Sequence, residues 1–85
     1  MPMHYILLCR SLTTAQRAER ALRRAGVFAS VTKAPRGANP GGCTYAVKLG
    51  ERNLDRALSL LREQGVPVGK IYSVDEAGDI REAAP

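Results

Sequence analysis

The chain has 85 residues, enough for one small domain, and its 45% hydrophobic and 25% charged residues are ordinary for a folded protein and argue against a disordered chain. Lysine and arginine outnumber acidic residues 13 to 8, so the net charge of +5 favours an anionic partner, whether nucleic acid, phosphate or an acidic protein surface. No apolar run approaches the ~20 residues needed to cross a bilayer, and the run at residues 5–9 is too short for a signal peptide. We therefore expect a cytoplasmic protein.

The first third of the chain predicts a strand followed by a helix. Residues 4–9 form a short apolar run typical of a buried strand. Residues 15–25 contain neither glycine nor proline, and Ser11, Thr13 and Thr14 before them are residue types that cap helices. The apolar positions of this helix recur at helical spacing and are Ala15, Ala18, Ala21, Leu22 and Ala25.

The middle of the chain predicts two strands joined by a loop. Residues 27–34 are rich in β-branched side chains, which favour a strand. Residues 35–42 contain two prolines and three glycines and therefore form a loop. From Cys43 to Leu49, apolar and polar residues alternate, so this strand has two distinct faces.

The last third predicts a second helix, a fourth strand and a tail. Residues 51–64 are helical in pattern, and Gly65 follows them as Gly26 follows the first helix, each suited to end a helix. Residues 68–74 form the fourth predicted strand. The residues after them are small and polar, which is typical of a flexible tail. The apolar face of the second helix consists of Leu54, Ala57, Leu58 and Leu61.

The order β-α-β-β-α-β predicts an α+β fold, the ferredoxin-like sandwich, in which two helices cover one face of a four-stranded antiparallel sheet of order 4-1-3-2. We assign residues 1–75 to this single domain and residues 76–85 to a flexible C-terminal tail. In this topology one rim of the sheet collects the end of the first strand and the start of the first helix. The other segments expected at this rim are the 35–42 loop, Cys43 and residues 65–67.

Cys43 is the main candidate for chemistry. The N–H groups at the start of the first helix, together with Arg10, Lys33 and Arg36, would favour its thiolate over its thiol. A thiolate can accept sulfur or selenium or attack a disulfide. The alternative, which composition and spacing alone favour, is that Cys43 packs at the start of its strand as Tyr45 does.

The second cysteine, Cys9, ends an apolar strand, so we expect a small core residue. A disulfide or redox switch that joins Cys9 to Cys43 is the alternative, although a reducing cytosol favours two thiols. No CxxC pair occurs and the lone His4 is not spaced to complete a zinc site, so we expect no metal and a structural role for His4.

Four arginines lie outside the apolar stripe of the first helix. A solvated helix face explains them most simply, and a stripe that docks phosphate or a partner is the alternative. Thr13 and Thr14 either cap the helix or help to bind an oxyanion. Aromatic residues are scarce and the third strand lacks an RNA-binding motif, so nucleic acid is not the expected partner. The four arginines are Arg17, Arg20, Arg23 and Arg24.

Short motifs spread over residues 5–74 resemble those of a known family. They are Tyr5-Ile6-Leu7-Leu8, Ser11-Leu12-Thr13-Thr14, Ala25-Gly26-Val27, Ala34-Pro35-Arg36 and Cys43-Thr44-Tyr45-Ala46-Val47. Together they resemble the selenium/sulfur carrier-like family of small βαββαβ domains. The resemblance implies that Cys43 carries sulfur or selenium as a persulfide or perselenide. It also implies donor and acceptor enzymes as partners, and no cofactor apart from this cargo.

On this hypothesis the protein is a carrier and not an enzyme. The cargo would be bound by Arg10, Thr13, Thr14, Arg36, Gly41 and Gly42. The sequence departs from the family at Thr44, where the family usually has glycine, and a β-branched residue stiffens the backbone there. The alternative function is a non-catalytic ferredoxin-like module that binds an anion or nucleic acid through the arginines of the first helix. Exposed sheet edges in so small a domain also lead us to expect a homodimer.

Overall fold

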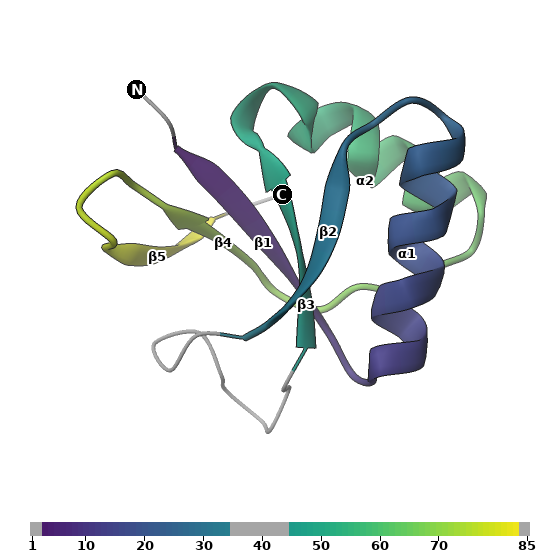
Figure 1. The fold of residues 1–85 in the computed structure, drawn as a ribbon, viewed down its shortest axis with the longest axis horizontal. Helices are drawn as coiled ribbons and strands as arrows, with labels where there is room; N and C mark the ends of the chain where they lie inside the picture. Colours follow the sequence, from purple (N-terminus) through teal and green to yellow (C-terminus); the bar gives the residue numbers. More distant parts are fainter. Residues whose placement is uncertain (1–2, 35–44, 84–85) are drawn as a thin grey trace.

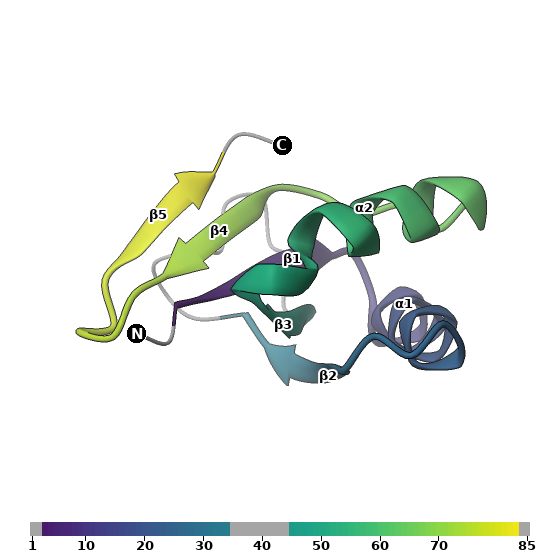
Figure 2. The same ribbon diagram turned by 90° about the horizontal axis from the view of Figure 1, so that it is seen from above.

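The computed structural model describes residues 3–34 and 45–83, which form a five-stranded antiparallel sheet and two α-helices (Figures 1 and 2). The strands lie in the order β2-β3-β1-β4-β5. The α+β class is therefore confirmed, and the predicted order of the first four strands is confirmed with it. The elements are β1 (His4–Cys9), α1 (Leu12–Arg24), β2 (Ala29–Lys33), β3 (Tyr45–Gly50), the 3-10 helix η3 (Glu51–Asn53), α2 (Leu54–Glu63), β4 (Ile71–Val74) and β5 (Ile80–Ala83).

The fifth strand corrects the prediction of a four-stranded sheet. β5 lies within residues 76–85, whose composition predicts a flexible tail, and it pairs antiparallel with β4. The turn between the two strands is organised by Asp75, whose carboxylate accepts hydrogen bonds of 3.0 Å from the backbone N–H groups of Ala77 and Asp79. An aspartate that bonds the backbone ahead of it is a common turn device. The turn at Asp75 and the pairing with β4 therefore order β5, whose sequence lacks a strong strand pattern of its own.

Both helices end as predicted. Gly26 and Gly65 follow them with φ of 80° and 69°, in the left-handed region that favours glycine. α1 begins earlier than predicted, because Ser11 caps it and the helix starts at Leu12. Neither helix has the length and apolar character that crossing a membrane requires.

The main core lies between the sheet and both helices, so the prediction that the two helices cover the same face is confirmed. Leu7 and Cys9 of β1 meet the buried side of the helices there. On the other face of the sheet, Ile6, Leu8 and Tyr72 are also buried. β1 is buried on both faces, which explains its unbroken apolar run. The helix residues fully buried in the main core are Ala15, Ala18, Leu22, Ala57 and Leu61.

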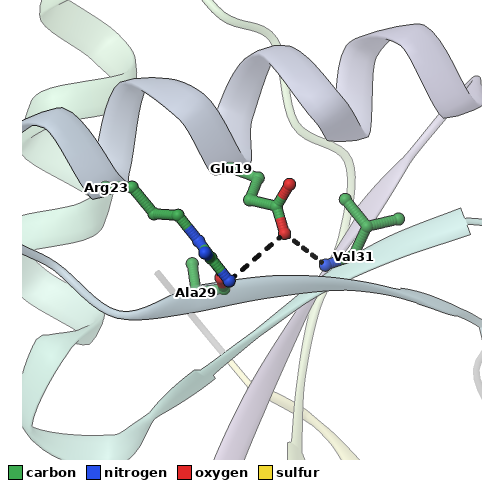
Figure 3. Close-up of polar contacts among 4 residues, drawn as sticks. All are labelled: Glu19, Arg23, Ala29 and Val31. Carbon is green, nitrogen blue, oxygen red and sulfur yellow. Dashed lines mark hydrogen bonds and ion pairs between the residues drawn. The ribbon is translucent and has the colours of Figure 1, made fainter.

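Two side chains of α1 bond the outer edge of β2 (Figure 3). Glu19 Oε2 accepts a hydrogen bond from Val31 N at 3.3 Å, and Arg23 Nε donates one to Ala29 O at 3.0 Å. The two side chains also form an ion pair, with Arg23 Nη2 at 3.7 Å from Glu19 Oε2. The C=O of Ala29 and the N–H of Val31 are backbone groups with which an added strand would pair. The homodimer remains a prediction, and along this part of β2 the two side chains compete with strand addition.

We expect Leu22→Ala to lower the free energy of unfolding by about 2–5 kcal/mol, because it removes a fully buried side chain from the main core. The matched control is Leu12→Ala on the same helix, where the leucine is 40% exposed and the expected loss is below about 1 kcal/mol. Equilibrium urea unfolding measures both variants. Equal losses would contradict the assignment of the core.

We expect Glu19→Ala to speed hydrogen exchange at the Val31 amide by up to about tenfold, because a hydrogen bond contributes about 0.5–1.5 kcal/mol. Amide exchange followed by NMR measures this effect residue by residue. The control is Glu63→Ala on α2, which should leave the Val31 amide unchanged. The edge contact would be disproved by an unchanged rate in Glu19→Ala.

Candidate functional site

Strand ends gather at one rim of the sheet, at the lower side of the view in Figure 1. Cys9 at the end of β1 has Tyr45 as its Cα partner, and Lys33 at the end of β2 pairs with the same residue. Gly69, ahead of β4, donates a hydrogen bond of 2.7 Å from its backbone N to Leu8 O. α1 also starts here, directly after its cap at Ser11. The strand ends and the start of α1 therefore meet at the predicted rim, whereas residues 65–67, which are also predicted there, do not.

The residues proposed from the sequence divide into two groups. Arg10, Thr13, Thr14 and Cys9 lie at the rim, on β1, on α1 or between them. The remaining candidates lie outside the described residues and are Arg36, Gly41, Gly42 and Cys43, together with Thr44.

The start of α1 differs in detail from the prediction. Ser11 is the cap, because its side-chain oxygen accepts a hydrogen bond of 3.1 Å from the backbone N–H of Thr14. Thr13 and Thr14 therefore lie inside the first turn. The N–H of Thr14 is thus already engaged. Within the described residues, the N–H groups of Leu12 and Thr13 have no acceptor, and they lie at the positive end of the helix dipole. The side chain of Arg10 is exposed beside them.

Cys9 is a core residue, as predicted. It is 1% exposed, and its Sγ donates to Leu7 O at 3.6 Å. Its sulfur is therefore buried in the core cluster that β1 shares with both helices. Its Cα partner Tyr45 follows Cys43 by two residues in the sequence.

The segment predicted to reach the rim after α2 is displaced from it. Val66 is buried and lies beside Arg17 and Ala21 of α1 in a groove between the helices. The chain reaches the rim only at Gly69. The predicted strand order places residues 68–74 beside the first strand, but the sequence does not fix the register that brings Gly69 to Leu8, so this contact was missed.

The arginines of α1 do not form a single uniform face. Arg23 is engaged at the edge of β2, and its guanidinium carbon lies 5.5 Å from the ring centroid of Phe28. Arg17, Arg20 and Arg24 line the groove between α1 and α2. The spacing of Glu19 and Arg23, four residues apart, is a signal for their ion pair, but only the fold shows that both reach β2.

His4 lies at the other end of β1 from the rim, where its Cα partner on β3 is Gly50. Burial lowers the pKa of His4 below its usual 6.5, and the positive charge of Lys48 lowers it further. His4 therefore stays neutral near pH 7, in agreement with a structural role. Across residues 3–34 and 45–83, no group of three or more His, Cys, Asp and Glu is placed to hold a metal ion.

The chain was compared with known proteins. No curated protein sequence matches it. The model of a family described as "Putative Se/S carrier protein-like" matches residues 4–73. This span runs from β1 into β4 and includes both helices, the rim and Cys43. The chain therefore belongs to the Se/S carrier protein-like family.

Proposed function

We propose that the protein carries reduced sulfur or selenium, bound covalently to Cys43, from a donor enzyme to an acceptor enzyme. Membership of the Se/S carrier protein-like family supports this proposal. The observation that carries it is the pairing of Tyr45 with Cys9 at the rim where α1 begins. Cys43 precedes Tyr45 by two residues in the sequence, and two residues of chain span at most about 7 Å, which supports a site at this rim.

The charge of the rim suits a sulfur anion. The N–H groups of Leu12 and Thr13, which no acceptor among the described residues engages, carry partial positive charge, and the exposed Arg10 adds a full charge beside them. Lys33, the last residue of β2, is exposed at the same rim. Such surroundings stabilise a thiolate, and the same charges would stabilise the anionic persulfide or perselenide.

In the proposal, the loop supplies the rest of the site. Arg36 adds a second guanidinium, and Gly41 and Gly42 leave the backbone bare ahead of the sulfur so that a partner can approach closely. Thr44 follows the sulfur with a stiffer backbone than glycine has, which restricts the angles of approach.

The transfer requires no net oxidation. The Cys43 thiolate attacks the terminal sulfur of a persulfide on the donor, the donor's S–S bond breaks, and the donor leaves as a thiolate. Cys43 then holds the terminal sulfur with its proton. An acceptor thiolate attacks that sulfur in turn and releases the Cys43 thiolate. Selenium follows the same course, and the protein acts as a carrier that is regenerated by its two partner enzymes.

We expect wild type to gain the mass of one or more sulfur atoms after incubation with a cysteine desulfurase and cysteine, and of selenium after incubation with selenite and thiol. Intact-mass spectrometry measures both adducts. Cys43→Ser should gain neither, because it lacks the nucleophile.

The control is Cys9→Ala, which replaces the buried thiol with another small core residue and should load as wild type does. The proposal fails if wild type gains no adduct or if Cys43→Ser gains the same one. Loss of loading in Cys9→Ala alone, with the fold retained by circular dichroism, would contradict a single-thiol carrier and favour paired chemistry.

A further inference from the structure

α1 and α2 are neighbours on the same face of the sheet (Figures 1 and 2), and an open groove of about 340 Å³ lies between them. One wall carries three exposed arginines of α1. Leu60 of α2 and the buried Val66 give the groove an apolar surface, to which Ala21 adds from α1. The three arginines are Arg17, Arg20 and Arg24.

The positive charge of this groove is not neutralised within the described part of the chain. Arg17, Arg20 and Arg24 recur at i, i+3 and i+7, so they form one stripe along α1. Among residues 3–34 and 45–83, no carboxylate lines the groove. The ion pairs that the described residues form, Glu19 with Arg23 and Lys70 with Glu82, leave these three arginines out.

The positive charge and the apolar surface of the groove together indicate which class of molecule would bind there. A nucleic acid strand would use aromatic side chains for stacking, and the described residues that line the groove include none. Exposed ion pairs contribute only about 0.2–1 kcal/mol each, so stable docking also needs contact with Leu60 and Val66. An amphipathic helix with acidic residues offers both, since its apolar face lies in a groove while carboxylates flank it.

We propose that this groove docks an acidic amphipathic helix of a partner protein, with carboxylates spaced i, i+3 and i+7 opposite the three arginines and an apolar side chain against Leu60 and Val66. The docking itself does not require cargo on Cys43. Arg17 lies six residues beyond the cap at Ser11, about 9 Å along the helix, so a docked partner stands beside the rim. Only the use of this position for cargo transfer rests on the proposed function.

The probe is a labelled helical peptide of about 16 residues with three glutamates at i, i+3 and i+7 beside leucines, and its analogue has glutamine in place of each glutamate. At low salt we expect the acidic peptide to bind at least about tenfold more tightly, with affinity falling as salt rises. Chemical shifts of the ¹⁵N-labelled full chain should change at Ala21, Ala25, Leu60 and Val66.

Protein variants test the arginines. R17Q/R20Q/R24Q keeps good helix formers and should lose at least about tenfold in affinity. R52Q/R62Q/R81Q removes the same charge from exposed positions outside the groove and should lose less than about twofold. Far-UV circular dichroism confirms that both triple variants are folded.

Several outcomes would overturn the inference. These are equal affinity for the two peptides, equal losses in the two triple variants, or shift changes confined to residues outside the groove. Tighter binding of a single-stranded oligonucleotide with the same arginine dependence would reassign the groove to nucleic acid. Cys43→Ser should still bind the peptide, and R17Q/R20Q/R24Q should still take up sulfur from small-molecule persulfide, so the two proposals fail separately.

Discussion

The pairing of β1 with β3 decides where the proposed site of this protein lies. Its register joins Cys9 to Tyr45, so the end of a buried strand, the start of α1 and the chain that follows Cys43 meet at one rim. A shift of one residue would exchange the side chains of β1 that face the helices. Because Ala15 and Ala18 of α1 share one buried cluster with Leu7 and Cys9, the core and the position of the rim are specified together.

Much of this arrangement could be predicted from the sequence, because hydrophobic periodicity marks the first four strands and both helices, and topology then orders them. The position of the rim follows from that order. β5 could not be predicted by composition, since its order depends on pairing with β4 and on the turn at Asp75. The choice of Ser11 as the cap was likewise open, because Thr13 and Thr14 suit a cap equally well and only the hydrogen bond decides.

α1 contributes residues to the core, to the edge of β2, to the rim and to the groove. Its buried face supplies the core, and Glu19 and Arg23 bond the edge of β2. Its first turn brings to the rim two N–H groups that no described residue engages, and Arg17 begins the stripe that lines the groove. The sequence shows these residues as one charged helix face. Only the fold divides them, because the neighbours of each side chain depend on which element packs beside it.

In the proposed function, Cys43 reacts as a thiolate that the positive charge of the rim stabilises. The most direct measurement is the rate of alkylation of Cys43 against pH in the Cys9→Ala background, with and without Arg10→Gln. We predict that the pKa of Cys43 lies below the value usual for cysteine, that Arg10→Gln raises it, and that urea unfolding restores the usual value. A pKa at or above the usual value in the folded protein, unchanged by Arg10→Gln, would contradict the account.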